Sequence, residues 1–208
     1  MLDIDNELEF IDQGYDLVVG IDEVGRGSWA GPLYMCAYVY ENDQLVVSGV
    51  NDSKLLSIQK RKSIYKELRV FPYIVNTYSN DEIDKHGLGK TVNIALKSLV
   101  EKVESQYQGK KLKFLVDGYF KGKWNDNVDF IKKGDQSVYS IAAASVIAKV
   151  ERDNWMIVQS RKYKGYDFEN NVGYGTKKHR QALEKKGVCP IHRMSYKPIK
   201  RILKQKTK

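Results

Sequence analysis

Three acidic residues follow short apolar runs and stand where they could do chemistry together. Asp22 and Glu23 follow residues 17–21, and Asp117 follows residues 113–116. Each run is typical of a buried strand, and ligands of an open α/β sheet collect beyond the carboxyl ends of its strands. If the two strands are neighbours, their carboxylates face one another. Acids held so close repel each other unless a cation shares the site, and Mg²⁺ or Mn²⁺ suits such oxygen ligands.

A further acid, Asp135, precedes an alanine-rich segment that is predicted to be a helix. Negative charge is favoured near a helix N-terminus. Taken alone, each acid also has an ordinary structural interpretation: Asp135 as a helix cap, Asp117 with the next glycine as a turn signal, and Asp22 with Glu23 as an acidic turn. The local patterns leave both interpretations open.

The elements that would position these acids follow from the apolar periodicity. Strands are predicted over residues 17–21, 33–40, 73–78, 113–117 and 128–131, and helices over residues 57–70, 88–107, 137–161 and 176–186. This alternation predicts an α/β fold, with a core over residues 1–160 and a C-terminal helical cap over residues 161–208 within one structural unit. The basic residues from 200 to 208 are predicted to form a solvated tail.

The composition favours a polyanionic partner and a reducing compartment. The chain has 208 residues, a formal charge of +9 and a pI near 9.3, so nucleic acid is the commonest choice, although lysine-rich surfaces also serve solubility. The pattern indicates no secretory signal and no membrane-spanning run. Cys36 and Cys189 match no metal-binding spacing and are predicted to be reduced thiols. We therefore expect a cytoplasmic protein without a membrane partner, and a monomer by default.

Five segments match one family pattern in order. They are residues 20–27 (GIDEVGRG), residues 51–56 (NDSKLL), residues 116–118 (VDG), residues 133–135 (KGD) with 140–153 (SIAAASVIAKVERD), and residues 173–176 (GYGT) with His179, residues 190–193 (PIHR) and Ser195. Together they resemble type 2 ribonuclease H of the bacterial ribonuclease HII kind, over most of the chain. Arg26 separates the chain from the related HIII branch, which typically has threonine there. Ser28 is a departure, since proline is common at its position.

The resemblance implies a ribonuclease H-like mixed central sheet flanked by helices, with the C-terminal helical region completing the substrate cleft. It implies four catalytic acids that hold two Mg²⁺ or Mn²⁺ ions: Asp22, Glu23, Asp117 and Asp135. It also implies an endonuclease that hydrolyses the RNA strand of RNA/DNA hybrids and cuts 5' of single ribonucleotides embedded in duplex DNA. Two such ions activate water and stabilise the leaving 3'-oxygen, which gives 5'-phosphate and 3'-hydroxyl ends.

Substrate-binding residues are expected within or beside the same segments. Gly25, Arg26 and Gly27 let the backbone approach a ribose closely. Tyr174 matches the family tyrosine that contacts the sugar at the ribonucleotide–DNA junction, although a packed aromatic in a glycine turn is the ordinary alternative. The expected phosphate contacts are basic residues near the motifs: Lys54, Lys149, Lys177, Lys178 and Arg193.

Some of these residues have a structural alternative. Lys149 could instead be the partner of an acid. His179 and His192 are predicted to be hydrogen-bonding residues of the cap rather than catalysts.

Two rival functions fit part of the pattern. A nucleic-acid-binding module with an inactive nuclease-like fold would explain the charge, but the presence of all four acids argues against it. A nuclease of the same fold acting on DNA would leave Gly25, Gly27 and Tyr174 without a ribose to contact. The sequence therefore favours the ribonuclease.

Overall fold

The computed structural model describes residues 2–206 and the side chains of residues 2–204. The chain divides into two compact units, each assembled from separate stretches of sequence. Unit 1 comprises the residues up to 24 together with residues 34–76 and 93–150, and unit 2 comprises residues 25–33 and 77–92 together with the residues from 151 onward. The boundary near residue 160 was predicted as a single point along the chain. Such a prediction cannot show which distant segments pack together.

Unit 1 is built on a five-stranded mixed sheet in the order β3-β2-β1-β4-β5. Its strands are β1 (Leu17–Val24), β2 (Leu33–Glu41), β3 (Tyr73–Tyr78), β4 (Leu112–Asp117) and β5 (Val128–Ile131). β1 pairs antiparallel with β2 and parallel with β4, and β4 pairs parallel with β5. The five predicted strands and the mixed sheet are confirmed.

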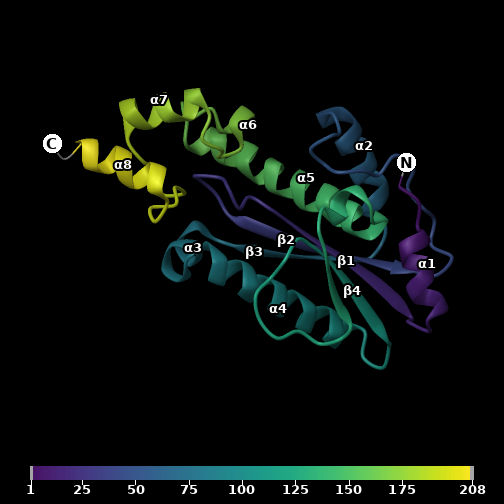
Figure 1. Cartoon of the computed structure of the whole chain (residues 1–208). Helices are drawn as coiled ribbons and strands as arrows, with labels where there is room; N and C mark the ends of the chain where they lie inside the picture. The colour runs from purple at the N-terminus through teal and green to yellow at the C-terminus, as the bar shows by residue number, and fades with distance from the viewer. Residues whose placement is uncertain (1, 207–208) are drawn as a thin grey trace. The chain divides into compact units, whose positions relative to one another are not determined.

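Helices cover both faces of this sheet. They are α1 (Asp5–Asp12), α2 (Ile58–Leu68), α4 (Leu88–Gln106) and the first half of α5 (Tyr139–Lys162). α2 and α5 lie on one side of the sheet, and α4 lies on the other (Figure 1). The segment from Ile141 to Ala148 is buried against β1 and β2, so the alanine-rich helix belongs to the core.

Two helix starts in unit 1 have identifiable caps. Ser57 accepts a hydrogen bond from the backbone of Lys60, as the sequence predicts for the start of α2. At the start of α5 the backbone N–H of Ser140 donates to Glu7 Oε1 at 2.7 Å. The acid that serves this helix start therefore comes from α1, a helix that the sequence pattern did not predict.

Within its described residues, unit 2 contains the second half of α5, the first turn of α4 and four complete helices. These are α3 (Asn80–His86), α6 (Phe168–Asn171), α7 (Lys177–Lys186) and α8 (Lys197–Lys206). Its core is an apolar cluster that includes Met156, Phe168, Leu183 and Ile199. α7 was predicted with its Thr176 cap, which accepts from His179 N.

The predicted solvated tail from residue 200 has exposed basic side chains at Lys200, Arg201 and Lys204, but it is helical and is anchored by a buried isoleucine. α8 is a helix, and Ile199 and Ile202 are buried on one face of it. The three-residue spacing of these two residues is a helical signal, but basic residues surround it. Residues 207 and 208 of the expected tail lie outside the described residues.

The structure also bears on the predictions for the cysteines and for membrane-spanning segments. Cys36 and Cys189 are both buried, and neither forms a disulfide among the described residues. Among residues 2–206, no helix is long and apolar enough to cross a membrane.

Candidate active site

Asp22 and Asp117 lie at equivalent positions of neighbouring parallel strands. The pairing of β1 with β4 runs to Ile21 and Val116, so Asp22 and Asp117 are the next residues of their strands. β1 does not stop at Ile21 as expected but continues to Val24, because its other edge still pairs with β2. The two carboxylates therefore lie at one edge of the sheet.

Asp22 is buried in an environment that disfavours its charge. Its residue is 5% exposed. Burial raises the pKa of Asp22 well above its ordinary value, the charges of Glu23 and Asp117 raise it further, and a hydrogen bond with Ser145 of α5 opposes them. Because solvent cannot screen these charges, the site favours a bound cation.

Asp135 reaches the same cluster through a tight turn after β5. Lys133 adopts a left-handed conformation with φ 59°, and the 3-10 turn Gly134–Gln136 follows. Gly134 N donates to Asp117 Oδ1 at 2.7 Å. Burial and then the charge of Asp135 raise the pKa of Asp117. Three acids that are distant in sequence thus act on one another in unit 1.

Lys54 brings a positive charge to these acids. Its Nζ donates to Asp135 Oδ2 at 3.1 Å and lies 3.8 Å from Asp52 Oδ1. Burial acts against the charge of Lys54, but the interactions with Asp135, Asp52 and Asp22 together raise its pKa. The side chain remains 71% exposed, so the ion pair is accessible to an incoming anion.

The donor set fits a hard divalent cation, although the acids are not arranged as a complete metal centre. Within the described part of the chain, no three His, Cys, Asp or Glu side chains are placed to hold a metal ion by themselves. The repulsion among Asp22, Glu23 and Asp117 is what a cation would relieve, and carboxylate oxygens are the ligands of Mg²⁺ and Mn²⁺. Mg²⁺ usually uses few carboxylates and keeps several waters.

In unit 2, the loop after β1 is shaped by glycine and by a buried arginine. Gly25 has φ +96°, and a Cβ there would lie 2.3 Å from Arg152 Nε. The guanidinium of Arg152 donates to Pro32 O at 2.9 Å, to Val172 O at 2.9 Å and to Ser28 Oγ at 2.7 Å. Ser28, the departure from the family pattern, thereby contributes a hydroxyl that also donates to Gly25 O at 2.9 Å.

The same loop lies against Tyr174. A Cβ on Gly27 would lie 3.8 Å from Tyr174 Cε1, and Arg152 Cζ lies 5.6 Å from the centroid of the tyrosine ring. Sequence reasoning placed Gly27 and Tyr174 separately, and the structure brings them together within unit 2. Sequence reasoning did not single out Arg152, although that residue lies inside the matched segment 140–153.

Arg193 is enclosed, which favours a role in positioning the loop. It is 0% exposed, and it donates to Gly31 O at 2.9 Å, to Arg26 O at 3.1 Å and to Tyr196 Oη at 2.7 Å. Burial lowers its pKa, and the interaction with Tyr196 opposes that shift. We therefore expect Arg193 to hold the Arg26 backbone rather than to contact phosphate from the surface.

The remaining basic candidates lie on helices. Lys149 is half-buried on α5 within unit 1. Lys177 and Lys178 begin α7 in unit 2, where Lys178 Nζ lies 3.9 Å from Asp167 Oδ1. Their contacts with phosphate remain predictions.

His179 and His192 form a buried pair that contacts the backbone of Tyr174. Their Nε2 atoms lie 3.0 Å apart, and His179 Nδ1 lies 2.9 Å from Tyr174 O. Cys189 N donates to His192 Nδ1 at 2.8 Å, so His192 is a donor at Nε2, and His179 is a donor at Nδ1. Both rings are neutral in this network, and burial lowers the pKa of each.

We expect the free energy of unfolding to fall as the pH drops from about 6.5 to about 4. The pKa of His192 is lowered to about 4 in the folded chain, against about 6.5 in an unfolded chain. Between these values the unfolded chain binds a proton that the folded chain does not. The stability contributed by neutral His192 is complete above pH 6.5 and is lost towards pH 4, at up to about 1.4 kcal/mol per pH unit.

Urea unfolding of the wild type and of His192→Gln at pH 7 and pH 5 measures this contribution. The wild type should lose more stability between the two pH values than the variant does. Equal losses would show that His192 titrates alike in the folded and unfolded chains.

Known proteins with similar sequences and structures identify the family of this chain. Residues 19–199 match the family described as Ribonuclease HII. The ribonuclease HII of Ligilactobacillus salivarius is 40% identical over 199 residues, which cover 95% of this chain and 76% of that protein. The ribonuclease HII of Caldicellulosiruptor bescii is 38% identical over 201 residues, which cover 95% and 93%.

Two solved structures have the same fold. The ribonuclease H2 of Pyrococcus horikoshii OT3 is 25% identical with a TM-score of 0.74, covering 92% of this chain and 99% of that chain. The Bst ribonuclease HIII in complex with Mn²⁺ is 20% identical with a TM-score of 0.72, covering 91% and 70%, and its likeness concerns the fold alone. The mixed sheet flanked by helices therefore has the ribonuclease H-like fold.

The chain belongs to the ribonuclease HII family. It is accordingly an endoribonuclease of the type 2 ribonuclease H class, whose members depend on divalent metal ions.

Proposed function

We propose that this protein hydrolyses the RNA strand of RNA/DNA hybrids and cuts 5' of single ribonucleotides embedded in duplex DNA. The observation that carries the hydrolytic part is the row of interacting acids in unit 1: Asp22 interacts with Glu23 and Asp117, and Asp117 interacts with Asp135. Two Mg²⁺ or Mn²⁺ ions held by these acids would supply an activated water and stabilise the leaving 3'-oxygen. The products would carry 5'-phosphate and 3'-hydroxyl ends.

The side chains of the site have separate tasks in this proposal. Asp22 and Asp117 provide buried negative charge at adjacent strand ends, and Gly134 N orients the Asp117 carboxylate. Lys54 neutralises Asp135 before substrate arrives, and its exposed ammonium is free to turn to a phosphate oxygen. The two buried cysteines outside any disulfide and the excess of positive charge support a cytoplasmic protein with a nucleic-acid partner.

We assign ribose recognition to the loop of unit 2. A 2'-hydroxyl both donates and accepts hydrogen bonds, and backbone groups can approach it where no side chain intervenes. A Cβ on Gly27 would lie 3.8 Å from Tyr174 Cε1, so the two residues face the same small space, and Arg152 fixes the loop from its buried side. Tyr174 would then pack on the sugar while the backbone at Arg26 and Gly27 reads the hydroxyl.

The proposal is tested by cleavage of a labelled RNA/DNA hybrid in Mg²⁺ or Mn²⁺ by the wild type and by Asp117→Asn. The wild type should cut the RNA strand and leave 5'-phosphates, and the variant should bind the hybrid without cutting it. An all-DNA duplex should remain intact. If the wild type binds the hybrid and never cuts it in either metal, the chain is a binding module.

Gly27→Ala is expected to lower cleavage while preserving the fold. The added Cβ meets only Tyr174 Cε1 at 3.8 Å, an ordinary contact, so folding is unaffected. The methyl group would stand where a ribose has to approach, and a displacement of about 1 Å costs about 10²-fold in rate. Steady-state cleavage of a hybrid measures kcat/KM, with Gly89→Ala, which meets no atom within 4 Å, as control. Full activity of Gly27→Ala would contradict the assignment of ribose recognition to the loop after β1.

A further inference from the structure

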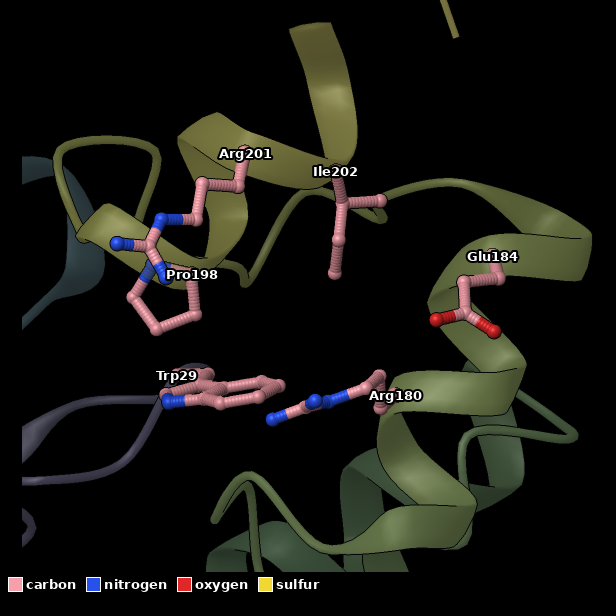
Figure 2. Close-up of a pocket in the computed structure, with 6 residues that line it drawn as sticks. All are labelled: Trp29, Arg180, Glu184, Pro198, Arg201 and Ile202. Carbon is pink, nitrogen blue, oxygen red and sulfur yellow. The ribbon is translucent and has the colours of Figure 1, made fainter. Parts of the chain in front are cut away.

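Unit 2 contains a pocket that the proposed chemistry does not use. It has a volume of about 280 Å³. Its walls come from the loop after β1, from α7 and from α8, and Figure 2 shows the lining side chains around one open space. The lining residues are Trp29, Arg180, Glu184, Pro198, Arg201 and Ile202.

The Trp29 indole forms a fixed aromatic wall of this pocket. A Cβ on Gly175 would lie 2.1 Å from Trp29 Cε2, so the ring rests directly on the backbone at Gly175. Trp29 N donates to Gly173 O at 2.7 Å, and Arg193 N donates to Trp29 O at 2.8 Å. The aromatic surface is therefore held before any ligand arrives, on the loop after β1.

Two guanidinium groups line the pocket without carboxylate partners. Arg180 Cζ lies 5.8 Å from the centroid of the Trp29 ring, and Arg201 extends from α8 on the opposite side of the space (Figure 2). Neither arginine forms an ion pair with any carboxylate of residues 2–204. Both side chains are exposed, so an anion can reach them.

The remaining lining residues add apolar surface and a carboxylate to the pocket. Pro198 and Ile202 provide apolar surface facing Trp29, and Glu184 places a carboxylate at one side (Figure 2). A nucleobase stacks on an aromatic face, phosphate pairs with guanidinium groups, and a carboxylate accepts from an exocyclic amino group. The volume lies just below the roughly 300 Å³ at which pockets for drug-sized ligands begin, so it suits one nucleotide.

We propose that this pocket binds one unpaired nucleotide of the nucleic-acid substrate. Its base stacks on Trp29, its phosphate lies between Arg180 and Arg201, and Glu184 accepts from a base amino group. A base inside a duplex has both faces covered, so only a nucleotide at a strand end, in an overhang or out of the stack can enter. The substrate as source of this nucleotide rests on the proposed function, whereas the nucleotide chemistry of the pocket does not.

Binding of deoxyadenosine monophosphate, followed by NMR titration without metal, tests the chemistry of the pocket. The double variant Arg180→Gln, Arg201→Gln should bind at least about ten-fold more weakly than the wild type, because it loses two charged contacts. The double variant Lys185→Gln, Lys200→Gln removes the same charge from α7 and α8 outside the pocket and should bind like the wild type. Equal binding by the two double variants, or no saturable binding by the wild type, would overturn the proposal.

A second arm identifies the source of the nucleotide. A duplex with a one-nucleotide adenine overhang should bind the wild type more tightly than the blunt duplex, and the arginine double variant should lose this difference. If the monophosphate binds but the overhang adds no affinity, the pocket is a site for free nucleotides and the substrate assignment is wrong. Hybrid cleavage by the same proteins reports on the proposed function separately, since blunt hybrids do not need this pocket.

Discussion

Asp22→Asn is expected to lower the rate of hybrid cleavage by at least about 10³-fold. Losing a single oriented electrostatic group in an active site already costs about 10²–10³-fold. Asp22 is buried, and the charges of Glu23 and Asp117 act on it. Single-turnover cleavage at saturating enzyme measures the chemical step. Asp12→Asn, which changes an exposed acid at the end of α1, should retain full activity.

The same substitution should not destabilise the protein. In a chelator, Asp22→Asn removes a buried charge that Glu23 and Asp117 repel, while an amide can still hydrogen-bond with Ser145. We expect an unchanged or higher Tm, with about 2–4 °C for each 1 kcal/mol recovered in a chain of this size. A variant that is both inactive and markedly less stable would make Asp22 a structural residue and weaken its assignment to the active site.

Gly20→Ala is expected to lower the free energy of unfolding by about 3 kcal/mol or more. A Cβ on Gly20 would lie 2.1 Å from Ser140 C and 2.3 Å from Ile141 N, which are backbone atoms of α5. No change of rotamer relieves such a contact, so β1 and α5 would have to separate. Because β1 carries Asp22 and α5 carries Ser145, cleavage should fall as well.

Urea unfolding of Gly20→Ala beside Gly89→Ala measures this effect. Gly89 lies in α4 with nothing within 4 Å of an added Cβ, so its replacement should raise stability by about 0.5–1 kcal/mol. If the two variants were equally stable, β1 and α5 would not be in close backbone contact.

Periodicity in the sequence was sufficient to predict most of the elements that carry the acids. The apolar runs before Asp22 and Asp117 are strands, and they are neighbours in the sheet. The alanine-rich stretch forms α5, and its small side chains let that helix lie against Gly20. Local hydrophobic pattern predicts these features because it is a property of consecutive residues.

Contacts between distant residues could not be predicted in this way. Asp135 comes close to Asp117 through a turn in which Lys133 adopts a left-handed conformation. A lysine gives no sequence signal for that conformation. Arg193 was expected to contact phosphate because it is basic and lies within a matched segment, but it is buried and donates to the backbone of Arg26. Its burial depends on the packing of segments that are more than 160 residues apart.

The pocket beside Trp29 illustrates the same limit. Trp29, Arg180 and Arg201 come from three segments, and only the fold of unit 2 places them around one space. In sequence, Arg201 belongs to a basic stretch that resembles a solvated tail. That stretch is helical, with Ile199 and Ile202 buried on one face. The helix places Arg201 in the lining of the pocket.

Cleavage of duplex DNA that contains one ribonucleotide tests the central claim most directly. The labelled duplex is incubated with the wild-type protein in Mg²⁺, in Mn²⁺ and in a chelator, beside the same duplex with a deoxyribonucleotide at that position. We predict one cut on the 5' side of the ribonucleotide, with 3'-hydroxyl and 5'-phosphate ends, only in the presence of metal. Cleavage of the all-DNA duplex at the same rate, or cleavage that persists in the chelator, would contradict the account.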